Sequence, residues 1–349
     1  MGHGDGIKNA VGKSMKVYEI KDSSGIDGLK ISERREPVPG YGQALVKVRA
    51  TSLNYRDLAT VKGAAARTIK LPLVPLSDGA GEIVKVGEGV TRVKPGDRVA
   101  AIFMQSWIAG RPNDAVGRSA LGGSIDGMLA EYVALHENGL VHIPDYMSYE
   151  EAATLPCAGV TSWNALVTEG KLKSGESVLT MGTGGVSIFA IQFARMHGAR
   201  VIATSSSDRK LERLRELGAS DVINYKTTPD WHERVLELTG GAGVDHVIEV
   251  GGPGTLGKSL RAVRMGGRVS LIGILTGGGE INPMPVLRKA VSLQGIFVGS
   301  REMFEDMNRA MDLNHTRPVI DRVFPFEEAR EAYRYLESGA HLGKVCIGL

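Results

Sequence analysis

The strongest constraint on the fold is a regular alternation of short apolar segments and helix-period segments between residues 177 and 273. The apolar segments are "SVLTM", "RVIATS", "DVINY", "DHVIEV" and "GRVSLIG", and segments such as "DRKLERLRELG" and "DWHERVLELTG" lie between them. Short apolar strands spaced by helices are typical of a parallel sheet that is covered on both faces. We therefore predict a doubly wound α/β domain in this part of the chain.

The segments on either side favour β structure. Between residues 15 and 143 the runs "ALVKVRATSLN", "GAGEIVKVGEGV", "GDRVAAIF" and "AEYVAL" are bounded by turns and interrupted by no long helical pattern. The tail from residue 300 mixes helices and strands, so we expect it to return to this β-rich part. A chain of 349 residues is also too long for one typical core. The prediction is one domain from residues 15–143 and 300–349, a second from 144–299, and a loose glycine-rich extension over 1–14.

Composition excludes several classes of protein. The formal net charge is +3 and no long basic run occurs, so we expect no nucleic-acid partner. No apolar run reaches membrane-spanning length, so no membrane partner is expected either. The two cysteines suggest no disulfide framework, and a reducing, cytoplasmic location is predicted.

A glycine turn follows the first strand of the α/β part. Gly182, Gly184 and Gly185 stand between "SVLTM" and an apolar helix pattern, with Thr183 and Val186 beside them. Glycines at such a turn let the backbone approach a pyrophosphate, and the helix N-terminus supplies N–H groups for it. We interpret the turn as a dinucleotide-binding loop. The alternative is a turn of the same shape that binds no phosphate.

The residues at the end of the second strand indicate which dinucleotide cofactor is preferred. An acid there would accept hydrogen bonds from a ribose 2′-OH, but this chain has Ser205, Ser206 and then Ser207. Hydroxyl groups can donate to a 2′-phosphate, Lys210 adds positive charge, and Tyr225 at the end of the third strand can flank the adenine. We predict that the cofactor is NADP(H).

Two observations leave room for another interpretation of this strand end. Ser207 or Asp208 is also suited to cap the helix that follows. The carboxylate of Asp208 would weaken phosphate binding unless it points into the helix cap.

With both domains placed, the chain resembles the medium-chain dehydrogenase/reductase superfamily over nearly its whole length. The resemblance rests on "LNYRDLATVKG", "PLVPLSDGAGEIVKVGEGVTRVKPGDRV", "GMLAEYV", "LPCAGVTSWNAL", "MGTGGVSIFAIQFA" and "GKVCIGL". Within the superfamily the chain is most similar to the zinc-free quinone oxidoreductase branch. The resemblance implies a mostly β GroES-like catalytic domain, a Rossmann domain and a homodimer.

The resemblance also bears on metal binding. Zinc-dependent members place their catalytic zinc ligands at positions that match Asn54, Ser77 and Cys157 here, so one ligand of three is retained. A carboxylate beside the second position is retained as Asp78. A thiolate with one carboxylate is a poor tetrahedral zinc site, so no metal is predicted.

The resemblance implies a small set of site residues. Asn54 is the first candidate to donate a hydrogen bond to a substrate oxygen, Tyr55 is the candidate proton donor, and Thr161 lies on the nicotinamide side. The remaining cofactor contacts implied by family position are Ile274, Phe297, Val298 and Lys344.

These residues predict an NADPH-dependent reductase of a quinone or another small activated carbonyl compound. Without zinc, conjugated acceptors are easier to reduce than simple ketones because their developing charge is delocalised. The alternatives are a zinc-type alcohol dehydrogenase and a non-enzymatic NADPH-binding protein.

Overall fold

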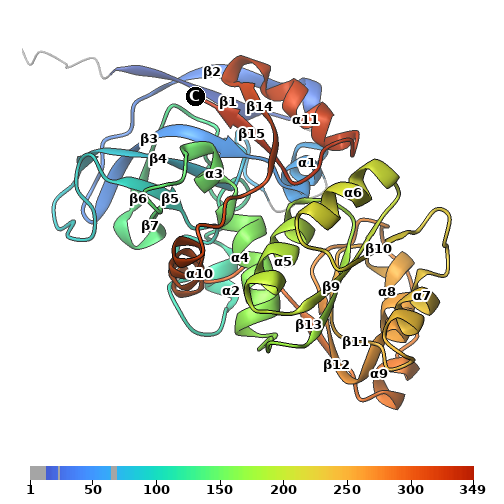
Figure 1. Ribbon diagram of the computed structural model, residues 1–349. Coiled ribbons are helices and arrows are strands. Elements are labelled where there is room, and N and C mark those ends of the chain that lie inside the picture. Colours follow the sequence, from blue (N-terminus) through green and yellow to red (C-terminus); the bar gives the residue numbers. More distant parts are fainter. Residues whose placement is uncertain (1–12, 23, 64–68) are drawn as a thin grey trace, which may run out of the picture.

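The computed structural model describes residues 13–22, 24–63 and 69–349, and these contain two large sheets and one two-stranded sheet, with helices packed around them (Figure 1). The first strand, β1 (Ser14–Ile20), begins one residue before the predicted start of the folded part. The prediction of a loose extension otherwise concerns residues 1–12, which lie outside the described residues.

The α/β part contains a six-stranded parallel sheet in the order β10-β9-β8-β11-β12-β13. Its strands are β8 (Ser177–Met181), β9 (Arg200–Ser205), β10 (Asp221–Asn224), β11 (Val244–Glu249), β12 (Val263–Leu271) and β13 (Ser292–Gly295). The associated helices are α5 (Gly185–Met196), α6 (Asp208–Glu216), α7 (Trp231–Leu238), α8 (Pro253–Ala262) and α9 (Met284–Arg288). The order reverses between β8 and β11, as in a Rossmann fold, and ligands bind outside the carboxyl ends of the strands at such a reversal. The predicted fold class is confirmed.

The second large sheet has the order β14-β15-β3-β4-β5-β7, and β6 pairs with β3. Its strands are β3 (Gln43–Ser52), β4 (Asp78–Val86), β5 (Arg98–Ala101), β6 (Tyr132–His136), β7 (Leu140–His142), β14 (Ile320–Pro325) and β15 (Lys344–Gly348). A separate pair joins β1 to β2 (Leu29–Arg35). The helices of this part are α1 (Tyr55–Val61), the short α2 (Asp114–Gly117), α10 (Arg301–Leu313) and α11 (Ala329–Glu337), with 3-10 turns at Gly25–Gly28, Glu137–Gly139 and Phe326–Glu328. Since β15 pairs antiparallel with β3, the tail of the chain returns to this second large sheet.

A helical segment over residues 149–168 connects the two sheets. It is not one regular helix: α3 (Tyr149–Ala153) and α4 (Val160–Trp163) alternate with π-helical turns at Leu155–Gly159 and Asn164–Thr168. Such turns are frequent at functional sites. Buried side chains of this segment, including Leu155 and Trp163, belong to one core that also contains Ala100 and Phe189, so both sheets share a continuous core.

The last strand of the parallel sheet is short and exposed. Within the apolar run "VSLQGIFVG", β13 spans only Ser292–Gly295, and all four residues are exposed in the single chain. It lies at the end of the sheet order, so its outer edge is unpaired within the part of the chain that the structure describes.

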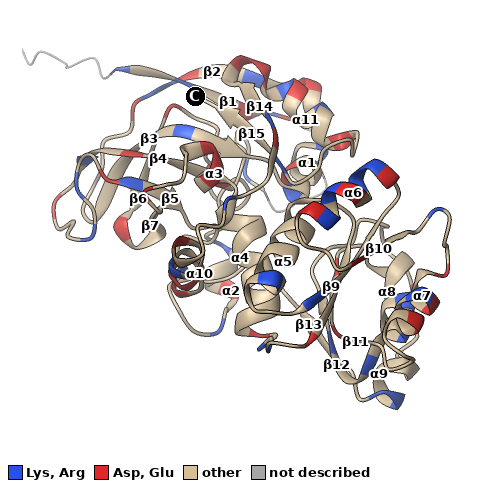
Figure 2. Ribbon diagram, in the orientation of Figure 1, with Lys and Arg blue, Asp and Glu red and all other residues tan. Residues whose placement is uncertain are grey.

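The charged residues are interspersed rather than segregated by sign. Basic and acidic positions alternate along α6, for example, and both signs occur around each sheet (Figure 2). No helix among the described residues is long and apolar enough to cross a membrane.

Candidate active site

The glycine turn has an open side beyond the end of β8. Gly182 has a φ of 73°, a conformation that favours glycine, and Gly184 precedes the first residue of α5. A Cβ atom at either glycine would meet no atom within 4 Å, so the turn faces free space. On its other side the Thr183 carbonyl accepts a hydrogen bond from the Gly343 N–H at 2.8 Å. The half-buried Val186 lies in the first turn of α5. The N-terminus of α5 is therefore suited to bind a phosphate group.

The serines after β9 form a compact turn. Ser205 is buried, and its Oγ accepts a hydrogen bond from the Ser207 N–H at 3.3 Å. Ser207 caps α6 by accepting from the Lys210 N–H, and Ser206 lies half-buried between them. The Ser205 Oγ–H remains a potential donor because these contacts use the oxygen only as an acceptor.

Asp208, Asn224 and Tyr225 are neighbours of this turn. The carboxylate of Asp208 accepts a hydrogen bond from Asn224 Nδ2 at 2.7 Å and is thus held toward β10. The exposed Tyr225 follows β10, and its N–H donates to the Ser205 carbonyl at 3.0 Å. These contacts bring together the residues that were predicted to bind a 2′-phosphate. The one exception is an ammonium group.

That group belongs to Lys210. Its Nζ donates to the carbonyl oxygens of Gly339 and His341, each at 2.8 Å, and burial lowers its pKa. The ammonium therefore holds the loop between α11 and β15, and its predicted contact with a 2′-phosphate stays a prediction.

Residues expected near the nicotinamide lie beyond the ends of β12 and β13. Ile274 and Phe297 are exposed, with 59% and 60% of their surface accessible. Val298 is buried with a φ of 57°, which is strained for a β-branched residue, and its carbonyl accepts from Asn164 Nδ2 at 2.7 Å. Thr161 is buried in α4.

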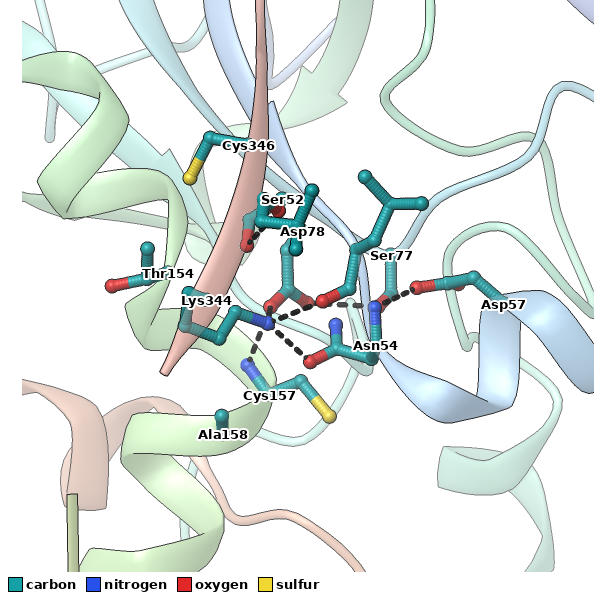
Figure 3. A network of polar contacts seen from close by, with 12 residues as sticks. Ser52, Asn54, Asp57, Ser77, Asp78, Thr154, Cys157, Ala158, Lys344 and Cys346 are labelled. Atoms are coloured by element: carbon teal, nitrogen blue, oxygen red, sulfur yellow. Dashed lines mark hydrogen bonds and ion pairs between the residues drawn. The ribbon is translucent and has the colours of Figure 1, made fainter. Parts of the chain in front are cut away.

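A buried polar network lies where β4, β15 and the start of α1 meet (Figure 3). The Lys344 ammonium donates to the Leu53 carbonyl at 2.7 Å and to Asn54 Oδ1 at 2.5 Å. It also lies 3.9 Å from Asp78 Oδ2, and Lys344 is only 3% exposed. Asp78 further accepts hydrogen bonds from the Ser77 hydroxyl at 2.8 Å and the Cys157 N–H at 3.2 Å.

The network contains two enclosed acids. Burial raises the pKa of Asp78 to about 6, and the positive charge of Lys344 opposes this shift. Burial also raises the pKa of Asp57, against the effect of the Arg56 guanidinium at 3.3 Å. The Asp57 carboxylate accepts from the Asn54 N–H at 2.8 Å and so fixes the turn into α1.

Two further side chains lie at the edge of this network. Tyr55, the first residue of α1, is 55% exposed, so its phenol is not part of the buried cluster. Cys157 is half-buried, and burial raises the pKa of its thiol well above the usual range. A neutral thiol is a weak nucleophile.

Comparison with known proteins identifies the family. Residues 40–145 match the alcohol dehydrogenase GroES-like domain, and residues 185–313 match the zinc-binding dehydrogenase family. A zinc-type alcohol dehydrogenase-like protein of Schizosaccharomyces pombe is 46% identical over 339 residues, which cover 95% of this chain and 98% of the relative. The chain belongs to the medium-chain dehydrogenase/reductase superfamily.

Other members of the superfamily support this assignment. A quinone oxidoreductase of Rattus norvegicus is 29% identical over 344 residues, covering 96% of this chain and 98% of the relative. The crystal structure of a provisionally named alcohol dehydrogenase of Sinorhizobium meliloti has a TM-score of 0.91 and 42% identity, covering 97% of this chain and 99% of that one. This medium-chain dehydrogenase/reductase is therefore an oxidoreductase.

The names of these relatives raise the question whether this medium-chain dehydrogenase/reductase can hold zinc. No three His, Cys, Asp or Glu side chains within residues 13–22, 24–63 and 69–349 are grouped so that they could bind a metal ion. The positions that match zinc ligands offer the Asn54 amide, the Ser77 hydroxyl already bonded to Asp78, and only one thiol, that of Cys157. These side chains do not fit a zinc ion, which prefers thiolate and imidazole ligands.

Two features of this site in the medium-chain dehydrogenase/reductase were not visible in the sequence: the direction of the Lys344 ammonium and the position of Glu249. Lys344 was expected near the cofactor; its methylene groups do border the glycine turn, but its ammonium points to Asn54. The buried Glu249, at the end of β11, accepts hydrogen bonds from the N–H groups of Gly251 and Gly252 at 2.8 and 3.0 Å. A carboxylate that ends an apolar strand before "GGPG" was the available signal for Glu249.

Proposed function

We propose that this oxidoreductase uses NADPH to reduce a quinone or an α,β-unsaturated carbonyl compound, without zinc. The observation that carries the proposal is the chemistry of the three positions that match zinc ligands. They offer an amide, a bonded hydroxyl and a single thiol, so only one of the three is a ligand of the kind that a catalytic zinc ion takes from its protein. A site without a metal favours acceptors whose developing charge is spread over a conjugated system.

The cofactor proposal rests on the two phosphate sites. The N–H groups at the start of α5 would bind the pyrophosphate, and the turn at Ser205 and Ser206 would bind the 2′-phosphate. No acid occupies the end of β9, and Asn224 holds the nearby Asp208 carboxylate. Reduced nicotinamide supplies a hydride when it is bound.

The protein's own groups would handle the substrate oxygen and the proton. Asn54 Nδ2 is buried beside Asp78 but makes no hydrogen bond of normal geometry with the described residues. A substrate oxygen that gains negative charge would be its partner, and preorganised donors of this kind stabilise such charge. Tyr55, being exposed, can exchange a proton with solvent and would deliver it to the reduced product.

A spectrophotometric assay in EDTA tests the proposal. The loss of reduced nicotinamide absorbance would be followed with NADPH and with NADH, each against a quinone, an enone and a simple ketone. Turnover of the quinone or the enone with NADPH is the expected result. Turnover that requires added zinc and uses the ketone would contradict it.

A zinc-type alcohol dehydrogenase is the second candidate. The name of the Schizosaccharomyces pombe relative and the retained Cys157 and Asp78 favour it. If NADPH binds tightly while every acceptor fails with and without zinc, the third candidate, a non-enzymatic NADPH-binding protein, is favoured instead.

We also propose that the protein forms a homodimer through the free edge of β13. The exposed apolar side chains Leu287, Leu293 and Phe297 lie on or near this strand. An unpaired edge with apolar side chains is prone to pair with another chain. Light scattering should give twice the monomer mass, and Leu293→Asp should give the monomer. A wild-type monomer at micromolar concentration would contradict this part of the proposal.

A further inference from the structure

The Lys344 ammonium is enclosed by oxygen atoms from two segments of the chain. It donates to the Leu53 carbonyl and to Asn54 Oδ1, and it faces Asp78 Oδ2 at 3.9 Å. An ammonium group has only donors, so the Asn54 amide must present its oxygen to it and turn its Nδ2 away (Figure 3). The orientation of Asn54 is thus determined by Lys344.

The stem of Lys344 is held equally firmly. A Cβ atom at Gly185 would lie 2.5 Å from Lys344 Cδ, so the lysine passes directly over the start of α5. Lys344 also begins β15, whose strand partner is β3. Its charge therefore cannot swing out to solvent without moving the strand or the glycine turn.

The positive charge of Lys344 balances the negative charge of buried acids. Asp78 and Asp57 are both buried, and the positive charges that act on them come from Lys344 and Arg56. Buried charges are tolerated when they are paired. The positive charge next to Asp78 therefore belongs to the protein itself.

We propose that the Lys344 ammonium is the fixed cation of this site: it holds Asn54 and Asp78 in place and keeps a divalent metal ion out. A divalent ion bound among these residues would be repelled by the ammonium at short distance, in an enclosed region where water screens little. Lys344 is accordingly a positioning residue that acts through Asn54. The claim about metal exclusion is independent of the proposed function, whereas the claim about activity rests on the proposed function.

A rebuilt ligand set tests metal exclusion directly. Asn54→Cys with Ser77→His supplies two zinc ligands beside Cys157, and Lys344→Met is then added to or omitted from this background. Zinc affinity would be measured by calorimetry, and Co²⁺ absorption would report thiolate ligation. We expect at least about 100-fold tighter binding when Lys344 is also replaced, a ratio that corresponds to about 3 kcal/mol.

The control is Lys289→Met in the same rebuilt background. Lys289 also donates to backbone carbonyl oxygens, those of Leu260 and Arg261, but it lies in another part of the fold. This control should leave zinc affinity as weak as in the rebuilt background alone. Equal zinc affinity with and without Lys344 would overturn the proposal. If the variant with Lys344→Met does not fold, Lys344→Gln, which can still donate to Leu53, replaces it.

The activity test uses Lys344→Met and Lys344→Arg in the otherwise unchanged enzyme. Lys344→Met should lower kcat at least about tenfold and change KM for NADPH less than about threefold, while Lys344→Arg should recover part of kcat. A raised KM for NADPH with kcat unchanged would overturn the positioning role, because Lys344 would then serve the cofactor. A wild-type enzyme that is inactive toward every acceptor would contradict only the proposed function, since the zinc comparison still tests the fixed cation.

Discussion

The Lys344 ammonium and the Asn54 amide oxygen, 290 positions apart in sequence, are joined by a hydrogen bond of 2.5 Å. This contact attaches the first residue of β15 to the loop that begins α1, and the glycine turn lies on the other side of the lysine stem. The candidate substrate site and the candidate cofactor site thus share one side chain. Changes at Lys344 are expected to affect folding as well as chemistry.

The first prediction concerns stability. Replacing Lys344 by Met should lower the free energy of unfolding by about 3–5 kcal/mol, because it leaves the buried Asp78 without its counter-charge. The double variant with Lys344→Met and Asp78→Asn removes both charges, so its free energy of unfolding should fall clearly less. Urea unfolding of the two variants and the wild type measures the difference. Equal losses would mean that the ion pair is not what Lys344 contributes.

The second prediction concerns cofactor choice at the end of β9. Ser205→Asp should raise the Kd for NADPH at least about tenfold and lower that for NADH, since a carboxylate repels a 2′-phosphate and accepts from a 2′-OH. The Ser207 N–H can still donate to the new carboxylate, so the turn should persist. Fluorescence titration measures both constants. Ser205→Asn, which adds no charge, is the control and should keep the preference for NADPH.

The third prediction separates two roles of Lys210. If its ammonium exchanges the carbonyls of Gly339 and His341 for the 2′-phosphate, Lys210→Ala should weaken NADPH by about 1–2 kcal/mol and leave NADH nearly unchanged. Equal weakening of both cofactors would show that Lys210 only holds the loop between α11 and β15. Calorimetric titration with each cofactor distinguishes the two results.

The fourth prediction concerns acid stability through His341. Burial, aided by the Lys210 charge, lowers the pKa of His341 from 6.5 to about 4. The folded protein binds a proton at His341 less well than the unfolded chain does. Neutral His341 therefore contributes fully to the free energy of unfolding above pH 6.5, and this contribution is lost as the pH falls toward 4. The loss should reach about 3 kcal/mol.

Unfolding of the wild type and of His341→Gln between pH 7 and pH 4 provides the measurement. The stability of the wild type should fall relative to the variant across this range, and most steeply below pH 6.5. A difference between the two proteins that does not change with pH would show that His341 is protonated as easily in the folded state.

The sequence allowed the prediction of elements whose signals are local. The strands β8 to β12 and the Rossmann order follow from short apolar segments, and the cap of α6 follows from Ser207. The π-helical turns at Leu155–Gly159 and Asn164–Thr168 were not predictable, because packing between the two sheets rather than local propensity determines them.

The candidate site was predictable only in part, for a related reason. The glycine turn and the serines after β9 are contiguous, so their juxtaposition is visible in the sequence. The direction of the Lys344 ammonium and the attachment of Lys210 to residues 339–341 depend on contacts between distant segments. The exposure of β13 likewise depends on what lies at the edge of the sheet, and its pairing with a second copy stays a prediction.

The most direct test of the central claim is the rate of NADPH oxidation with a quinone or an enone in the presence of EDTA. Wild-type protein and Asn54→Ala would be compared at saturating NADPH, with NADH and a simple ketone as parallel reactions. We expect metal-independent turnover of the conjugated acceptor with NADPH, and a loss of kcat of at least about tenfold in Asn54→Ala. Turnover that appears only after zinc is added, and then with the simple ketone, would contradict it.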